Sequence, residues 1–252
     1  MTIISIVNLK GGVGKTTTAI NMSYGLAEEG KKVLLVDNDI QANASSFFDK
    51  RKAPKTITHV FMSKGEEKTL RAAIYKTKYN NLFILPAEME LAEANIEMSK
   101  TGEVEILKNC MKIINGEFDY VIIDNAPNMT ANVINAIIAS DDIIVPMEVD
   151  GFSMDGLEEV RKQIKVAKNS GLNKGLKLAG VLITKFNSRT KMDKEGVKQL
   201  RQQHNYKIFE NVIHMTVKVK ESVFAKIPII RFSKNSRAAL DYKNLVKEYL
   251  NL

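Results

Sequence analysis

Short apolar runs alternate along this chain with longer stretches in which apolar residues recur at helical spacing. The apolar runs have the length of buried strands, and continuous apolar character is typical of strands in a parallel sheet. These runs lie at 3–7, 32–36, 82–85, 120–123, 142–147 and 178–183. The stretches with helical spacing lie at 16–29, 87–98, 103–114, 129–139 and 153–170. The alternation predicts an α/β fold, with a mainly parallel twisted sheet flanked by helices on both faces.

Two regions follow this alternation less closely. Residues 40–80 contain short helical pieces at 44–48 and 70–75, with a charged segment between them. The C-terminal part predicts a helix at 191–204, a short strand at 207–209, a helical segment at 217–226, an apolar run at 227–230 and a helix at 237–249. No linker rich in glycine, serine or proline interrupts the 252 residues, so we expect a single domain spanning 1–252.

A glycine-rich segment at 9–17 separates the first predicted strand from the first predicted helix. It reads Leu-Lys-Gly-Gly-Val-Gly-Lys-Thr-Thr. A strand that ends in such a turn and continues as a helix directs several backbone N–H groups at one point, which suits a polyphosphate. The usual phosphate-binding loop begins with glycine, whereas this segment begins with Leu9 and carries a second lysine, Lys10, in addition to Lys15. The alternative is a glycine turn whose lysines bind nothing.

Carboxylates follow two of the predicted strands. Asp37 and Asp39 come after the strand at 32–36, and Asp124 comes after the strand at 120–123. Ligands of open α/β sheets bind at the carboxyl ends of the strands, so we expect these side chains near the glycine-rich segment. Asp37 and Asp39 are two residues apart and therefore point the same way. Both would repel a triphosphate unless a cation or a water lay between.

The composition excludes several classes of protein. No run of about 18 apolar residues is present, and the first residues form a predicted strand and not a basic and apolar leader. We therefore expect a soluble cytoplasmic protein. Cys110 is the only cysteine, which excludes an intramolecular disulfide, and its apolar neighbours indicate a core position. The histidines at 59, 204 and 214 have no metal-ligand spacing and receive no role.

The Lys-Gly-Gly-Val-Gly-Lys-Thr-Thr segment resembles the deviant Walker A loop of the ParA/MinD superfamily of P-loop NTPases. Further motifs stand in the order typical of the ParA/Soj-type DNA-partition ATPases of that superfamily. They are Val-Asp-Asn-Asp-Ile-Gln at 36–41, Ile-Ile-Asp-Asn-Ala-Pro at 122–127 and Ser-Arg-Ala-Ala-Leu-Asp-Tyr at 236–242. The resemblance covers nearly the whole chain. It implies ATP hydrolysis, with ATP and Mg²⁺ as cofactors and a homodimer as the working unit.

The resemblance assigns the phosphate contacts residue by residue. Lys15 would bind the β- and γ-phosphates, Thr16 would ligate Mg²⁺, and Thr17 would contact the α-phosphate. Lys10 would reach the nucleotide of the partner subunit and, with Lys15, would stabilise the charge on the leaving γ-phosphate. The alternative for Lys10 is a surface lysine that adds only positive field. The rest of the loop would complete the nucleotide site through Gly11, Gly12, Val13 and Gly14.

The carboxylates receive roles from the same resemblance. Asp39 would orient the attacking water, Asp37 would support the metal shell, and Asp124 would hold Mg²⁺ directly or through a water. Structural capping is the alternative for Asp37 and Asp39. The family commonly has Cys-Pro-Pro after the third carboxylate, whereas this chain has Asn-Ala-Pro at 125–127. That difference does not affect the metal role of Asp124. It does mean that the switch segment of the family, which follows this carboxylate, is not matched here.

A further segment suggests which base is bound. Thr-Lys-Phe-Asn at 184–187 ends a predicted strand and resembles the base-reading tetrapeptide of GTPases, with Asn187 where a carboxylate would read guanine. A carboxamide both donates and accepts, which matches the N1 and N6 edge of adenine better than the two donors of guanine. This favours ATP. The alternative is that Asn187 caps a loop.

The positive charge is concentrated at one end of the chain. Residues 185–252 carry a net charge of +9, whereas residues 1–184 carry −1. A basic segment of this kind suits a polyanion, although a solvated basic surface is the alternative. The family's DNA-contacting arginines match Arg189 and, as a lysine, Lys218; Lys220 and Arg237 lie near them in the chain. All four are expected to bind DNA phosphates without reading sequence.

The leading interpretation is an ATPase that forms an ATP-dependent sandwich dimer and binds DNA non-specifically. With a ParB-type centromere-binding protein it would segregate a plasmid or chromosome. It would act in the cytoplasm, at the nucleoid, and would not bind a membrane. The alternative is a MinD-like membrane-associated positioning ATPase, which needs a C-terminal helix with an exposed apolar face. One cysteine cannot hold an iron–sulfur cluster, and Tyr242 and Tyr249 are too few for the tail of a tyrosine autokinase.

Overall fold

One sheet organises the molecule. The computed structural model describes residues 1–50, 52–149, 153–202 and 206–252. Seven strands of this described chain are hydrogen-bonded in the order β3-β4-β2-β5-β1-β6-β7, and every neighbouring pair is parallel except β3 with β4. Their bounds are β1 (Thr2–Ile6), β2 (Val33–Asn38), β3 (Tyr75–Lys76), β4 (Leu82–Leu85), β5 (Tyr120–Asn125), β6 (Asp142–Met147) and β7 (Lys177–Ile183). The predicted mainly parallel sheet is confirmed.

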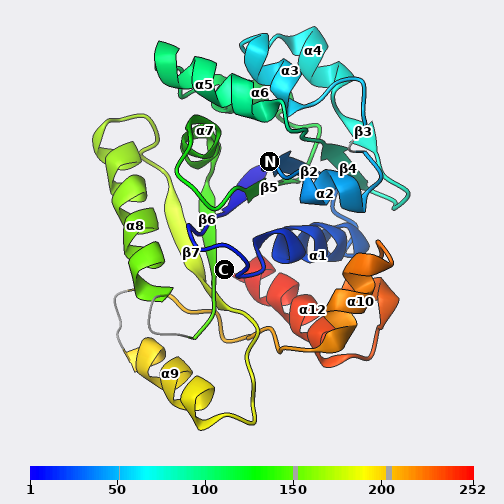
Figure 1. The fold of residues 1–252 in the computed structure, drawn as a ribbon, viewed down its shortest axis with the longest axis vertical. Coiled ribbons are helices and arrows are strands. Elements are labelled where there is room, and N and C mark those ends of the chain that lie inside the picture. Colours follow the sequence, from blue (N-terminus) through cyan, green and yellow to red (C-terminus); the bar gives the residue numbers. More distant parts are fainter. Residues whose placement is uncertain (51, 150–152, 203–205) are drawn as a thin grey trace.

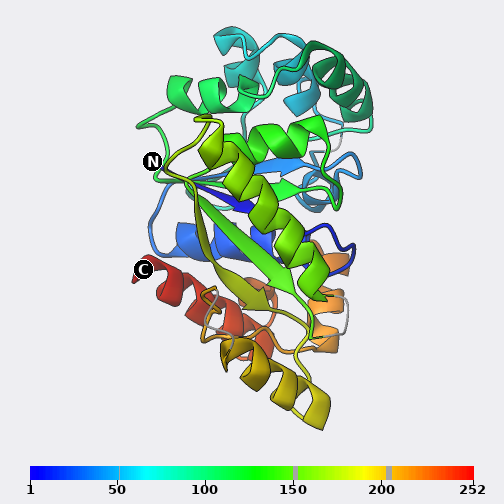
Figure 2. The ribbon, with the colours of Figure 1, turned by 90° about the vertical axis from the view of Figure 1, so that its left-hand side faces the viewer.

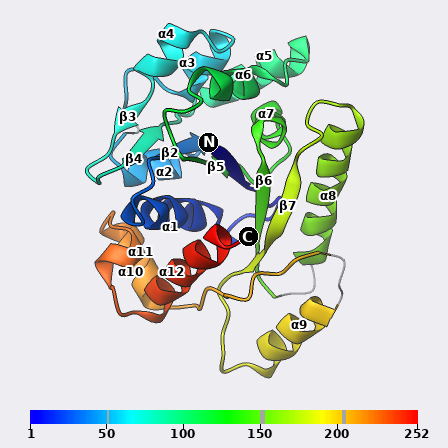
Figure 3. The same ribbon diagram turned by 180° about the vertical axis from the view of Figure 1, so that it is seen from behind.

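Helices cover both faces of the sheet, as Figures 1 and 2 show. On one face α1 packs with α11 and α12, and Figure 3 shows α10 beside them. On the other face α7 and α8 contact the strands, while α3, α5 and α6 extend that layer. The bounds are α1 (Lys15–Glu28), α2 (Asn43–Phe47), α3 (Ile57–Met62), α4 (Glu67–Ala72), α5 (Leu91–Thr101), α6 (Ile106–Ile113), α7 (Ala131–Ala139), α8 (Ser153–Asn169), α9 (Lys191–Gln202), α10 (Val217–Phe224), α11 (Ile229–Phe232) and α12 (Arg237–Leu250).

The core lies on both faces of the central strands, which explains their continuous apolar runs. In β2, Val33 and Leu35 pack into the cluster formed with α1 and α12, whereas Leu34 and Val36 pack into the cluster on the opposite face. Successive side chains of a strand point to opposite faces, so a strand buried on both sides must be apolar at every position. Cys110 is fully buried in the second cluster, which confirms the core position expected for it.

The strand order brings together the segments that carry polar residues. β5 lies between β2 and β1, and its Asp124 is paired in register with Asp37 of β2 and Ile6 of β1. The glycine-rich loop follows β1 directly and leads into α1. The carboxyl ends of β1, β2 and β5 therefore meet at one edge of the sheet, next to the start of α1.

Several local predictions were wrong. The helix α3 was not predicted; it begins with a capping box in which Thr56 and His59 satisfy each other's backbone N–H groups, and it buries Ile57, Val60 and Phe61. Tyr75, assigned to the end of a helix, begins the edge strand β3. The strand expected at 207–209 is only an isolated bridge of Ile208 to β7. The last two residues of the helix predicted at 191–204, including His204, lie outside the described residues.

Candidate functional site

The glycine-rich loop has a backbone that suits an anion. Gly12 and Gly14 adopt φ values of 78° and 89°, which residues with a Cβ rarely adopt. Gly14 is the N-cap of α1 and makes no side-chain cap, and the first turn of this described helix contains no acidic residue. The N–H groups at the start of α1 are therefore not capped by a side chain of that turn, and the helix dipole adds positive potential there.

Lys15 places a cation inside this loop. Its side chain is largely buried, and its Nζ donates a hydrogen bond to the carbonyl oxygen of Lys10 at 3.0 Å. Burial lowers the pKa of Lys15, and the charges of Asp124 and Asp39 oppose that shift. Two carboxylates thus lie close enough to Lys15 to favour its charged form. The backbone of Lys10 is fixed a second time, because its N–H donates to Asn8 Oδ1 at 2.9 Å.

Asp124 is a buried carboxylate without hydrogen-bond donors. Its residue is 0% exposed, and neither side-chain oxygen makes a hydrogen bond to the described residues. Burial raises its pKa well above the usual range and the charge of Asp37 adds to that effect, while the nearby Thr16 hydroxyl lowers the pKa. A buried carboxylate that lacks donors is costly unless a cation compensates it. Asp124 and Thr16 therefore fit a Mg²⁺ ion, which commonly takes one or two protein oxygens together with phosphate and water.

Asp37 differs from Asp124 because its oxygens already have partners. Oδ2 accepts hydrogen bonds from both the backbone N–H and the hydroxyl of Ser45, each at 2.7 Å, and Oδ1 accepts from the N–H of Asp39 at 3.3 Å. Burial nevertheless raises the pKa of Asp37 to about 6, against the effect of these donors. The structure thus has Asp37 anchoring the start of α2. Ser45 was missed by the sequence reasoning, and its position eight residues after Asp37 carries no recognisable signal.

Asp39 lies at the same edge and is 7% exposed. Its Oδ1 accepts a hydrogen bond from the N–H of Gln41 at 3.0 Å. It is close enough to Lys15 to affect the pKa of that lysine. The backbone N–H of Asp39 and its side-chain Oδ1 are thus both hydrogen-bonded. A carboxylate held in this way near Lys15 suits the orientation of a water.

A group of buried amides joins the strands behind these carboxylates. Asn38 Nδ2 donates to Asn125 Oδ1 at 2.8 Å and to the carbonyl oxygen of Asn132 at 3.0 Å. Asn132 Nδ2 returns a bond of 2.7 Å to the carbonyl oxygen of Asn38. Asn125 stands where the family commonly has the cysteine of Cys-Pro-Pro, and its side chain is hydrogen-bonded to Asn38 on β2. This network fixes the ends of β2 and β5 relative to each other and to α7.

A cavity of about 230 Å³ lies next to the loop. Its size is below that of a site for a whole drug-sized ligand and suits one ring system, such as a base. Gly14 and Thr17 border it on the loop side, and His214 and Tyr242 belong to its lining. The remaining lining residues are Thr184, Lys185, Ile213, Met215, Thr216, Val219 and Lys220. The sequence reasoning assigned no role to the segment 213–216, because it lies far from the loop in the chain and matches no motif.

Asn187 does not line this cavity. Its backbone N–H donates to Asp193 Oδ2 at 2.7 Å, and its side-chain Oδ1 accepts from the N–H of Arg189 at 3.1 Å. These bonds tie the turn that precedes α9. The structure therefore favours loop capping, which the sequence left open as the alternative for Asn187.

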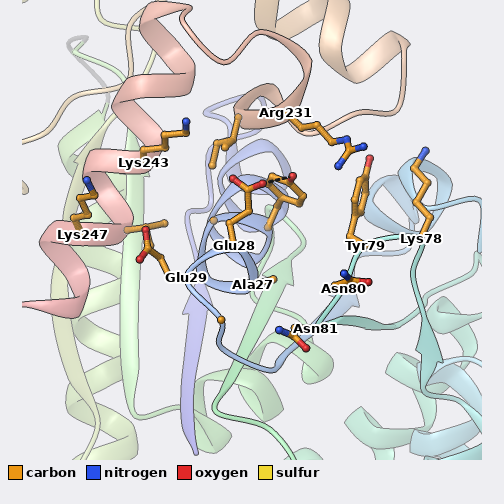
Figure 4. Close-up of a pocket in the computed structure, with 15 residues that line it drawn as sticks. Ala27, Glu28, Glu29, Lys78, Tyr79, Asn80, Asn81, Arg231, Lys243 and Lys247 are labelled. Atoms are coloured by element: carbon orange, nitrogen blue, oxygen red, sulfur yellow. Dashed lines mark hydrogen bonds between the residues drawn. The ribbon is translucent and has the colours of Figure 1, made fainter.

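A larger cavity, of about 700 Å³, lies at the other end of α1 (Figure 4). Its lining combines the basic Lys243 and Lys247 of α12 with the acidic Glu28 and Glu29. Arg231 of α11 also lines it and extends toward Tyr79 (Figure 4). It contains none of the loop residues or the strand-end carboxylates. The chemistry of the loop thus does not extend into this larger cavity.

The basic residues expected to bind DNA come from three separate segments. Phe186 is bridged to His214, which brings the loop with Arg189 beside the segment that leads into α10 with Lys218 and Lys220. Arg237 Nε lies 3.3 Å from His214 Nδ1 at the start of α12. All four cations are exposed. Lys218 also pairs with Glu221 at 2.8 Å, and Arg237 pairs with Asp241 at 3.3 Å.

Comparison with known proteins identifies relatives of this chain. Residues 1–178 match the family model described as an AAA domain. The chain is 34% identical to the sporulation initiation inhibitor protein Soj of Bacillus subtilis, over 98% of this chain and 97% of that protein. It is 31% identical to the chromosome partitioning protein ParA of Caulobacter vibrioides, over 99% of this chain and 94% of that protein.

A solved structure has the same fold. The cobyrinic acid a,c-diamide synthase of Mycobacterium smegmatis with bound ADP and magnesium superposes with a TM-score of 0.85 at 27% sequence identity, over 100% of this chain and 95% of that one. Sequence and fold therefore agree along nearly the whole length. The chain belongs to the ParA/Soj family of chromosome-partitioning ATPases.

Proposed function

We propose that this protein binds Mg²⁺ and ATP, forms a sandwich dimer with ATP, and in that state binds DNA without sequence preference. Hydrolysis releases the DNA, and a ParB-type partner stimulates it during segregation of a plasmid or chromosome. The observation that carries the proposal is the pairing of an anion-binding loop with the donor-free carboxylate Asp124 at the same sheet edge. ATP and Mg²⁺ supply the phosphates and the cation that these two features lack.

The proposed dimer is supported by the presence of a second lysine, Lys10, in the loop. Lys15 already provides the cation inside the loop of its own subunit, and its bond to the Lys10 carbonyl oxygen fixes the loop at Lys10. A second lysine at this place has no phosphate task within one subunit. Lys10 instead stabilises the transition-state charge on the nucleotide of the partner subunit, as a finger supplied in trans. Asp39 orients the attacking water within its own subunit.

DNA binding is supported by the convergence of Arg189, Lys218, Lys220 and Arg237 around the bridge between Phe186 and His214. The segment 213–216 that lines the cavity beside the loop also leads directly into α10. Nucleotide and DNA sites would therefore share a short stretch of backbone. In a dimer the number of bound phosphates doubles, which makes DNA affinity depend on ATP.

The MinD-like alternative is less well supported. It requires an amphipathic C-terminal helix with its apolar face free for lipid. The apolar face of α12 is buried against the domain through Tyr242, Leu245, Val246 and Tyr249. Among the helices that the structure describes, none combines the length and the apolar character needed to cross a bilayer. The proposed DNA binding would place the protein in the cytoplasm, at the nucleoid.

Co-sedimentation tests the proposal. The full-length Asp39→Ala protein, in which hydrolysis is slowed, is mixed with plasmid DNA or with anionic liposomes in the presence of ATP, ADP or no nucleotide. We expect sedimentation with DNA only when ATP is present, and no sedimentation with liposomes. Binding to liposomes with ATP and not to DNA would instead establish the membrane-associated alternative.

Charge substitutions locate the DNA site. The double variant Arg189→Ala/Lys218→Ala should bind every DNA tested more weakly, and the slope of log affinity against log salt should fall by about 0.9 for each DNA phosphate that is no longer neutralised. A matched control removes two exposed lysines outside the basic segment, Lys174 and Lys177. An unchanged salt slope in the first variant would show that these two residues do not bind DNA.

A further inference from the structure

The side chain of Asn8 joins the glycine-rich loop to the neighbouring strand. Asn8 lies two residues after the end of β1 and is 1% exposed. The backbone N–H of Val7 donates to the carbonyl oxygen of Ile144 at 3.0 Å, which continues the pairing of β1 with β6. Two residues further along β6, Asn8 Nδ2 donates to the carbonyl oxygen of Pro146 at 2.7 Å. The side chain thus extends the pairing by one bond at the point where the backbone turns into the loop.

The other end of the same amide holds Lys10. Asn8 Oδ1 accepts a hydrogen bond from the backbone N–H of Lys10 at 2.9 Å. The carbonyl oxygen of Lys10 accepts from Lys15 Nζ at 3.0 Å, so both polar groups of the Lys10 backbone are bonded. These two bonds differ in one respect. Lys15 is the cation expected to bind the nucleotide phosphates, so phosphate competes with the Lys10 oxygen for it, whereas both amide atoms of Asn8 are engaged within the protein.

Helix α8 closes the opposite side of the Asn8 amide. A Cβ at Gly156 would lie 2.8 Å from Asn8 Oδ1, which is closer than a Cβ normally approaches another atom. Glycine within a helix is less favourable than alanine, and here its lack of a side chain leaves room for the amide. The Asn8 side chain is therefore held between two hydrogen bonds and the backbone of a helix, and its position is fixed from three sides.

We propose that Asn8 is a positioning residue for Lys10. Its side chain ties the Lys10 backbone to the end of β6, against α8, and so sets where the Lys10 side chain meets the nucleotide of the partner subunit. This inference rests on the proposed role of Lys10 in trans. A long side chain reaches a defined point only when its backbone is held, and a small displacement of such a group lowers the rate strongly. The Asn8 anchor remains when ATP takes Lys15 away from the Lys10 oxygen.

Dimerisation gives the first test. Sedimentation velocity with Mg²⁺ and a non-hydrolysable ATP analogue compares the full-length wild type with Asn8→Ala. The variant should still bind the nucleotide as a monomer in calorimetric titrations, because Lys15 and the loop amides remain. Its dimer Kd should rise about 10-fold to 100-fold, since a symmetric dimer contains two copies of the anchor and each should account for about 3-fold to 10-fold.

The outcomes of this test are distinct. A purely structural role of Asn8 would lower the free energy of unfolding in urea without changing the dimer Kd of the folded protein. A wild-type dimer whose Kd is unchanged in Asn8→Ala would therefore refute the positioning role and leave the proposed function standing. A wild type that binds the analogue but stays monomeric would refute the proposed dimer itself, and the role of Asn8 with it.

A double-mutant cycle tests whether Asn8 acts through Lys10. The kcat for ATP hydrolysis with DNA present is measured for the wild type, Asn8→Ala, Lys10→Ala and the double variant. Asn8→Ala should lower kcat about 10-fold when Lys10 is present and have little further effect in the Lys10→Ala background. An equal loss in both backgrounds would show that Asn8 does not act through Lys10.

Gly156→Ala perturbs the same amide and keeps every bonding group. The added methyl group crowds Asn8 Oδ1 and should raise the dimer Kd, although alanine favours the helix. Asn8→Ala removes the crowded atom, so Gly156→Ala should have little effect in that background. In the matched control Gly175→Ala the nearest contact of the new Cβ is Asn173 Oδ1 at 3.8 Å, and the Kd should not change. A wild-type Kd in Gly156→Ala would refute the proposed dependence of Lys10 on the placement of Asn8.

Discussion

Asp124 gives a prediction in which stability and function change in opposite directions. The wild-type carboxylate is fully buried without a hydrogen-bond donor, so it destabilises the protein when no cation is bound. Asp124→Asn removes the charge at nearly constant volume. In EDTA and without nucleotide, the variant should be more stable than the wild type by about 1–3 kcal/mol. For a chain of this length that corresponds to a rise in Tm of about 2–4 °C per kcal/mol.

Adding Mg²⁺ and ATP should reduce this difference in stability or reverse it. A ligand at 100 times its Kd stabilises the folded state by about 2.7 kcal/mol, and the wild type should gain this amount because the cation compensates Asp124. The variant should gain much less from Mg²⁺ together with ATP than the wild type does. Thermal unfolding followed by circular dichroism measures both quantities in one set of samples.

The pH dependence of the same variant provides a separate check. Burial raises the pKa of Asp124 in the folded protein, so the wild type loses stability as pH rises and the carboxyl ionises. Asp124→Asn should lose that part of the dependence. The control Glu90→Gln removes an exposed carboxylate and should leave the response to nucleotide unchanged. A less stable Asp124→Asn protein in EDTA, or an undiminished gain from Mg²⁺ and ATP, would contradict the assignment of Asp124 as the cation ligand.

Three further predictions follow from single residues. Asp39→Ala should bind ATP normally but hydrolyse it about 10²-fold more slowly, equivalent to about 2.7 kcal/mol of barrier, so an unchanged kcat with DNA present would exclude Asp39 from catalysis. The pKa of Asp37 in the folded protein is raised from 3.8 to about 6, so the free energy of unfolding falls as pH rises through that window. Ser45→Ala removes the hydroxyl that stabilises the charged carboxylate, and urea unfolding should therefore show a steeper fall between about pH 4 and pH 7. An unchanged fall would exclude that role of Ser45. Burial raises the pKa of Cys110 to about 12, so the thiol should resist iodoacetamide at about pH 8 until the chain unfolds, and rapid labelling of the native protein would show that its helix opens.

The sequence predicted the sheet and the loop because both are local signals. Apolar runs that are buried on both faces, such as Val33 to Val36, are visible without knowledge of their neighbours. The loop is equally local: positive φ at Gly12 and Gly14 and the start of α1 at Lys15 are properties of consecutive residues. Short elements were less predictable, since α3 is defined by a capping box and by burial under neighbouring segments.

The partners of the site residues depended on the tertiary structure. Asp37, Asp39 and Asp124 were recognisable as residues at strand ends, but only the strand order places β5 between β2 and β1 and so pairs Asp37 with Asp124. Asn38 and Asn125 are 87 residues apart in the chain and 2.8 Å apart at their side chains. Contacts of that kind depend on how the whole chain packs, and no local pattern encodes them.

The cavity beside the loop shows the same division most clearly. The sequence placed base recognition at Asn187, because a tetrapeptide after a strand resembled a known reader. The structure turns the Asn187 side chain toward the N–H of Arg189 and puts His214 in the cavity, with Asp241 of α12 behind it. Residue type and spacing along the chain predicted a phosphate and cation site at the loop, because a strand, a glycine turn and a helix dipole act over a few residues. Which side chains line the cavity beside the loop was decided only when α12 and the segment 213–216 packed against the loop, since that packing joins residues far apart in the chain.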